Sequence, residues 1–99
     1  MKYMNVVKFS VKPAHTSAFR EALDSQPTWA GHIQGQTIQT GENTFCGCGL
    51  WESKDAMYAA MDSMVAWLDT VRHMLEEISP ELGVTDAVSG PVIAETGAS

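Results

Sequence analysis

Hydrophobic and polar residues alternate near the start of the chain, which predicts a β-strand over residues 3–11. The odd positions form one face (Tyr3, Asn5, Val7, Phe9 and Val11), and the even positions form the other (Met4, Val6, Lys8 and Ser10). Because successive side chains of a strand point to opposite faces, the more apolar odd face is expected to meet the helices.

Two helical regions are predicted from apolar residues spaced three and four positions apart. The first covers residues 14–24, just after Pro13, and the second begins after Ser53, a good N-cap residue. A bend or break is expected near residues 63–66, and Pro80 ends the second region. The two stripes consist of Ala18, Phe19, Ala22 and Leu23 in the first region, and of Ala56, Met57, Ala60, Met61, Met64, Leu68, Val71, Leu75 and Ile78 in the second.

Three further segments complete a recognisable order of elements. Residues 32–40 and 44–51 predict strands joined by a hairpin turn at Gly41-Glu42-Asn43, and residues 84–94 supply the last strand or two, with a bulge or kink at Gly90-Pro91. This order predicts an α+β fold, a ferredoxin-like βαββαβ domain with an antiparallel sheet. We expect residues 1–95 to form this single domain and residues 96–99 to form a frayed tail.

Neither face of the predicted strand at residues 44–51 carries the charges expected of a face in water. In the strand at residues 44–51, Cys46, Cys48 and Leu50 share one face, while Phe45 and Trp51 share the other. Two helical regions can cover only one face, so the second is expected to pack against another copy of the chain, giving a homodimer. The alternative is a monomer with an apolar surface.

The net charge of −6, from 12 acidic and 6 basic residues, narrows the choice of partners. Lysine and arginine form no cluster, which argues against nucleic acid and against an anionic membrane surface. Lys8 interrupts any signal-peptide core, and no apolar run reaches the length of a membrane span. The protein is therefore expected in the cytoplasm.

Three polar side chains are candidates for catalysis. His73 follows Asp69 by four residues, so both are expected on one helix face, where a carboxylate suits a histidine acting as general base or proton shuttle. The alternative is a surface pair with no catalytic role. Tyr58 is a second candidate for the base, and Asn5 can donate a hydrogen bond to a substrate carbonyl.

Aromatic and methionine side chains favour a pocket for a small flat aromatic ligand. Gly47 and Gly49 remove side chains from one face of their strand, which leaves space for such a ligand or for a closely packed helix. The alternative is ordinary core packing. The expected binding residues, all large and polarizable, are Trp67, Met57, Met61 and Trp29.

The two cysteines and the histidines near them in the sequence do not form the pattern of a metal site. Cys46 and Cys48 are expected to stay reduced, because a disulfide two residues along a strand would be strained. No histidine spacing nearby completes a set of metal ligands. His32, close to Gln34 and Gln36, is expected to face the partner subunit.

The segment Leu50-Trp51-Glu52-Ser53-Lys54-Asp55-Ala56 and the helical region after it resemble the antibiotic biosynthesis monooxygenase-like superfamily. Val11-Lys12-Pro13 and Ser89-Gly90-Pro91-Val92 fit the same template. The resemblance implies a dimeric α/β barrel of two ferredoxin-like subunits, with a pocket between the sheet and the helices of each. It also implies relatives that are cofactor-free oxygenases of aromatic polyketides or quinols, and others that degrade haem.

The haem-degrading branch uses an asparagine, a tryptophan and a histidine at positions that hold Val7, Ala60 and Thr70 here. That role is therefore not expected, and no cofactor is predicted. Two functions stay open: a cofactor-independent monooxygenase-like enzyme for a small aromatic or quinone-type compound, and a non-catalytic dimeric binding or stress-response module. An inward-facing histidine or tyrosine in a pocket lined by methionine and tryptophan would favour the enzyme.

Overall fold

The computed structural model describes residues 1–97, so the end of the expected tail, residues 98–99, lies outside the described residues. The strands are β1 (Tyr3–Ser10), β2 (His32–Gln39), β3 (Thr44–Trp51) and β4 (Thr85–Pro91). The helices are α1 (Thr16–Leu23), α2 (Lys54–Ala59) and α3 (Met61–Val71), with 3-10 turns η1 (Pro13–His15) and η2 (Arg72–Met74). The strands form one antiparallel sheet in the order β2-β3-β1-β4, which confirms the predicted ferredoxin-like α+β fold.

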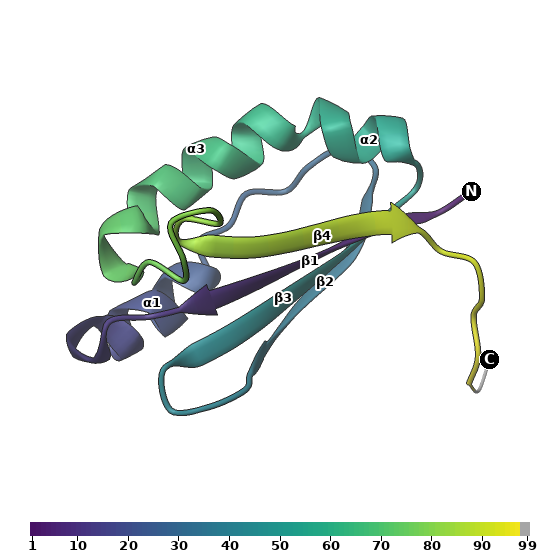
Figure 1. Cartoon of the computed structure of the whole chain (residues 1–99). Helices are drawn as coiled ribbons and strands as arrows, with labels where there is room; N and C mark the ends of the chain where they lie inside the picture. Colours follow the sequence, from purple (N-terminus) through teal and green to yellow (C-terminus); the bar gives the residue numbers. More distant parts are fainter. Residues whose placement is uncertain (98–99) are drawn as a thin grey trace.

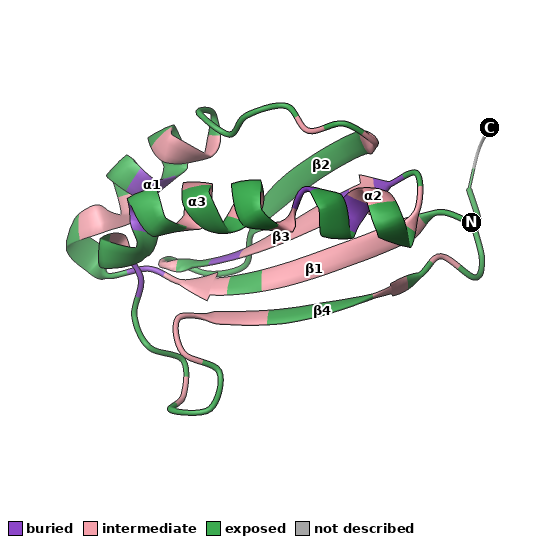
Figure 2. Ribbon diagram, turned by 90° about the horizontal axis from the view of Figure 1, so that it is seen from above, coloured by how far each residue is buried: buried purple, intermediate pink, exposed green. Residues whose placement is uncertain are grey.

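The three helices lie over one face of the sheet, as Figures 1 and 2 show from two directions. The odd positions of β1 face them, as predicted: the Phe9 ring lies 5.5 Å from the ring of Phe19 on α1, and the Phe45 ring of β3 lies 5.2 Å from it. No helix within residues 1–97 has both the length and the apolar character needed to cross a membrane.

The core consists of two separate clusters, one at each end of the sheet. The buried residues of the first are Val11, Phe19, Phe45, Val71 and Leu75, and those of the second are Trp51, Met57 and Ala60. Figure 2 shows buried stretches near α1 and near α2, with less buried sheet between them. The division follows from the sequence, because the middle of β3 carries Gly47 and Gly49, which have no side chains to fill the space beneath the helices.

The second helical region is shorter and breaks earlier than predicted. It breaks at Ala60, which joins α2 to α3, and not near residues 63–66. It ends with η2, because the chain then runs beside β1: Glu76 N donates to Ser10 O over 2.8 Å, and Leu75 bridges to Val11. The helical spacing of Leu75 and Ile78 therefore does not reflect a helix.

The other boundaries differ by a few residues. The first helical region divides into η1 and α1, and β2 ends one residue earlier than predicted, while β3 has the predicted bounds. The last strand ends at Pro91 instead of residue 94, and its pairing with β1 is regular, so the expected bulge is absent from this pair. Pro91 is tolerated there because β4 is an edge strand.

The second face of the sheet carries no helix (Figure 1). Its apolar residues are Met4, Val6, Cys46, Cys48 and Leu50 at the sheet centre, and Ile38 and Val88 at the edges, which are 57% and 64% exposed. The polar residues on the same face are Lys8, Ser10, Gln34, Gln36, Thr44 and Asp86. Cys46 and Cys48 are free thiols. Burial raises the pKa of the Cys48 thiol, and the neighbouring Cys46 raises it further, so Cys48 stays protonated at neutral pH.

Candidate functional site

A cleft of about 1190 Å³ lies between the helix-facing side of the sheet and the helices. It occupies the gap between the two core clusters. Its floor is the middle of β1, β2 and β3, including Asn5, Val7 and Gly47. One wall is α3, and the other comprises α1 and the segment that connects α1 with β2. The size of the cleft suits a multi-ring organic ligand.

Asn5 stands in the floor of the cleft with a fixed orientation. The indole Nε1 of Trp51 donates to Asn5 Oδ1 over 2.8 Å, and Trp51 itself is 1% exposed. Because Oδ1 accepts this bond, the amide nitrogen of Asn5 remains available to donate to a ligand. Gly49 makes the arrangement possible, since a Cβ there would overlap Asn5 Oδ1.

His32 lies in the same cleft, against Trp51. Their ring centroids are 4.6 Å apart with the planes inclined by 38°, and Trp29 approaches His32 edge-on at 5.7 Å. A Cβ on Gly35 would lie 3.0 Å from His32 Cε1, so this glycine gives the imidazole room. An amide and an imidazole therefore contact one buried indole from two sides.

The expectation that His32 faces a partner subunit was wrong. The register of β2 against β3 shifts between His32 and Gln34, where a β-bulge adds one residue. Beyond the bulge, Gln34 and Gln36 lie on the open face, opposite Leu50 and Cys48. The extra residue reverses the alternation, so His32 turns to the helix side.

The walls of the cleft are mainly apolar and aromatic. Trp29 comes from the segment before β2, and its Nε1 donates to Ser63 Oγ of α3 over 2.7 Å. Trp67 of α3 lies in the opposite wall, and its Nε1 makes a longer contact of 3.4 Å with Ser25 Oγ. The other apolar residues that α3 contributes are Met61, Met64, Val65 and Leu68.

Charged residues gather at the α1 rim of the cleft. Arg20, Glu21 and Asp24 line it and are exposed, and within residues 1–97 none of them forms an ion pair. Their sum is one negative charge, which favours a neutral ligand over an anion. Nowhere in the described part of the chain do three His, Cys, Asp or Glu side chains lie close enough together to hold a metal ion.

Four of the predicted site residues line the cleft: Asn5, Trp29, Met61 and Trp67. Met57 does not, because it is 2% exposed in the second core cluster. Tyr58 also lies outside the lining; it is 51% exposed, with Lys54 Nζ 5.7 Å from its ring centroid.

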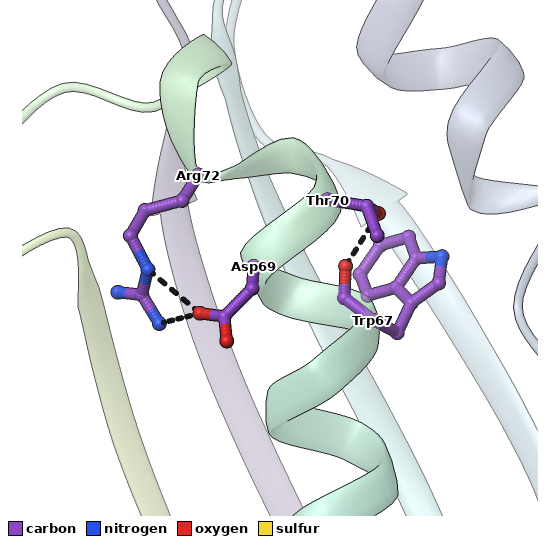
Figure 3. A network of polar contacts seen from close by, with 4 residues as sticks. All are labelled: Trp67, Asp69, Thr70 and Arg72. Carbon is purple, nitrogen blue, oxygen red and sulfur yellow. Dashed lines mark hydrogen bonds and ion pairs between the residues drawn. The ribbon is translucent and has the colours of Figure 1, made fainter.

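His73 lies outside the lining as well. Helix α3 ends at Val71, and the imidazole of His73 packs edge-on against His15 at 5.8 Å. The expected pairing with Asp69 does not form in the described chain, since that carboxylate accepts from Arg72 Nε and Nη2 at 3.1 and 2.9 Å (Figure 3).

Two side chains that now stand out, His32 and Trp51, were not among the predicted site residues. Trp51 was noted only for sharing a strand face with Phe45 and for its place in the segment Leu50-Trp51-Glu52-Ser53-Lys54-Asp55-Ala56. Its position opposite Asn5 follows from the register of β1 and β3, in which Tyr3 pairs with Trp51 and Asn5 pairs with Gly49. Two strands of equal length with matched apolar faces could have suggested this register.

No protein-family profile matches the sequence, and no curated protein matches it. Solved structures, however, match it along nearly its whole length. A Nitrosomonas europaea protein named as a candidate antibiotic biosynthesis monooxygenase is 21% identical, with a TM-score of 0.73, and the match covers 97% of this chain and 94% of that one. SnoaB of Streptomyces nogalater, a cofactor-independent oxygenase, is 13% identical with a TM-score of 0.68 over 95% of each chain.

A dimeric ferredoxin-like protein from an uncultured marine organism is 12% identical, with a TM-score of 0.74, and the match covers 99% of this chain and 93% of that one. The fold is that of the antibiotic biosynthesis monooxygenase-like proteins. At these identities the similarity concerns the fold, so any chemistry depends on the chain's own side chains.

Proposed function

We propose that this protein is a cofactor-independent, monooxygenase-like enzyme that acts on a small aromatic or quinone-type compound in the cleft. The observation that carries the proposal is the placement of His32 and Asn5 against the same buried indole, at the floor of a cleft with aromatic walls. The fold shared with the cofactor-independent oxygenase SnoaB supports it.

The cleft offers a flat ligand a surface on each side. The backbone of Gly47 leaves part of the floor without a side chain, since a Cβ there would meet its nearest atom only at 3.5 Å. Trp29, Trp67 and Met61 would contact the faces and edges of the rings. The negative rim favours a substrate that enters uncharged, such as a phenol, hydroquinol or anthrone.

The chemistry needs a base and a donor for the anion that forms. His32 would accept the proton of an acidic C–H or O–H group, and the Asn5 amide nitrogen would donate to the resulting oxyanion. Such an electron-rich anion can reduce O₂ directly. For an anthrone, the methylene carbon loses two hydrogens and gains a carbonyl oxygen; one atom of O₂ enters the quinone and the other leaves as water.

The exposed rim of the cleft favours a second function, a non-catalytic binding or stress-response module. Reactive anions are protected best in sites that exclude water. Here Arg20, Glu21 and Gln26 line the cleft and are exposed, so in the single chain the cleft is open to solvent. Such a module would bind the same flat compounds and release them unchanged.

Oxygen uptake with a panel of hydroquinols and anthrones separates the two functions. We expect at least one compound to be consumed with one O₂ per anthrone, and with ¹⁸O from ¹⁸O₂ in the quinone. The uptake should exceed that of boiled protein and of buffer. Saturable binding of the panel without uptake above these controls would contradict the enzyme and support the binding module.

We also propose that the protein is a homodimer joined through the open face of the sheet, in the cytoplasm, where its thiols stay reduced. The apolar residues of that face and the dimeric ferredoxin-like relative support this assembly.

Light scattering should return twice the 10.7 kDa mass of the chain. Val88→Glu, which places a charge on the open face, should return the single mass, because an unpaired charge in an apolar interface is costly. Leu82→Glu is the control, since Leu82 is 47% exposed in the turn before β4. A wild-type protein of 10.7 kDa in solution would contradict the dimer.

A further inference from the structure

Ser63 does not line the cleft, yet its hydroxyl contacts a residue that does. Ser63 Oγ accepts a 2.7 Å hydrogen bond from Trp29 Nε1, which joins α3 to the segment between α1 and β2. Figure 2 shows this segment crossing from α1 to the start of β2 on the side of α3 away from β4. The bond therefore spans the helical layer at the cleft.

The segment that carries Trp29 has little backbone support of its own. Within residues 1–97, no backbone N–H from Gln26 to Gly31 donates to a backbone carbonyl, and only two carbonyls of this segment accept from one: Trp29 O from His32 N at 3.2 Å, and Gly31 O from Glu52 N at 2.8 Å. Most of these residues are exposed. The position of the Trp29 ring thus depends on its bond to Ser63, on packing against the second core cluster, and on the bond that the Trp29 carbonyl accepts from His32 N.

Trp29 in turn contacts the imidazole that the proposed reaction uses. Its ring meets His32 edge-on, at 5.7 Å and 67°, while His32 lies against Trp51 at 4.6 Å. Trp51 then donates to Asn5 Oδ1. A continuous series of contacts therefore runs from Ser63 on α3, through three aromatic rings, to the Asn5 amide on β1.

We propose that Ser63 is a positioning residue for His32, an inference that rests on the proposed function. Its hydroxyl fixes the plane of Trp29, and the edge of Trp29 holds the imidazole against Trp51 and toward the ligand. Loss of the hydroxyl frees Trp29 to rotate, and His32 then samples orientations in which its nitrogens no longer reach the substrate.

NMR tests this inference without requiring turnover. Because His32 contacts two indoles, those of Trp29 and Trp51, ring currents should shift its Cε1–H signal away from those of His15 and His73. In ¹H–¹³C spectra of the whole protein, Ser63→Ala should displace the His32 signal alone. Ser63→Thr, which keeps the hydroxyl, should restore it.

Thr70→Ala is the matched control, because it also removes a hydroxyl from α3. Within residues 1–97, Thr70 Oγ1 donates only to the backbone carbonyl of Trp67, at 2.6 Å, so its loss should leave the His32 signal in place (Figure 3). A His32 signal that stays unmoved in Ser63→Ala, or that moves equally in Ser63→Ala and Ser63→Thr, would overturn the inference.

With a substrate from the panel, Ser63→Ala should lower kcat about three- to tenfold and leave KM within about twofold, because it disturbs the base more than the walls. Ser63→Thr should recover the wild-type kcat. A change confined to KM would overturn the positioning role. If no compound is turned over, the enzyme proposal fails by itself, while the NMR comparison still decides whether Ser63 positions His32.

Discussion

Gly31→Ala is expected to lower the free energy of unfolding by about 2–5 kcal/mol, a large share of the stability of a domain of this size. Two costs combine at this position. Gly31 has φ +80°, which costs a residue with a Cβ about 1–2 kcal/mol. A Cβ there would also lie 2.6 Å from Ala56 Cβ, and forced overpacking costs about 1–3 kcal/mol more.

Ala56 cannot yield by rotating, because its Cβ is attached directly to the backbone of α2. Either α2 or the start of β2 must therefore move. Gly31 O accepts from Glu52 N at 2.8 Å, so a shift would also disturb the turn that follows Trp51. We expect the displacement to reach His32, the next residue along the chain.

Gly83→Ala provides a control that separates the two costs. Gly83 has φ +75°, but a Cβ there would meet nothing within 4 Å. Gly83→Ala should therefore lower the free energy of unfolding only by the backbone cost, about 1–2 kcal/mol. Urea unfolding followed by tryptophan fluorescence measures both variants. Equal losses for Gly31→Ala and Gly83→Ala would show that the close approach of α2 to Gly31 costs nothing.

The alternation of residues along β1 and β3 was sufficient to predict the sheet and its helix-facing side. It placed Asn5 among apolar neighbours on the odd face, and glycines opposite it, which is where the cleft floor lies. Alternation succeeds there because β1 and β3 pair without a register shift along their whole length. All odd-numbered residues of the two strands therefore lie on one face of the sheet, and all even-numbered residues lie on the other.

The same rule failed at His32 because one extra residue in β2 reverses the alternation. The bulge is not visible in the sequence, since Ile33 and its neighbours have ordinary strand propensities. The expectation for His32 rested on its closeness to Gln34 and Gln36, which do lie on the open face. Gly35, whose missing Cβ leaves room for the imidazole, was the only local indication.

Helical spacing failed differently at His73. Counting from Asp69 presumes that α3 continues, but α3 ends at Val71, and Leu75 leaves the helix to pair with the end of β1. Long-range pairing thus determined the end of the helix, and local spacing could not reveal it. The carboxylate of Asp69 then accepts from Arg72, three residues away on the exposed surface.

His32→Gln should lower kcat by about 100-fold or more on any compound that the protein oxidises, because general bases contribute factors of about 10²–10⁴. Glutamine retains hydrogen-bonding atoms but cannot take up a proton at neutral pH. KM should change little, since the floor and both walls of the cleft remain. Loss of the contact with Trp51 should cost about 0.5–1.5 kcal/mol of stability, too little to unfold the domain.

The variants His15→Gln and His73→Gln test whether His32 or His73 is the base. His15 packs edge-on against His73 at 5.8 Å, away from the cleft lining, so His15→Gln controls for loss of an imidazole from the surface. Addition of free imidazole should partly restore turnover to a His32→Ala variant, whose smaller side chain leaves a gap beside Gly35. If His73→Gln abolishes oxygen uptake while His32→Gln preserves it, the base is His73, and the contacts that join His32 to Asn5 through Trp51 serve packing instead of catalysis.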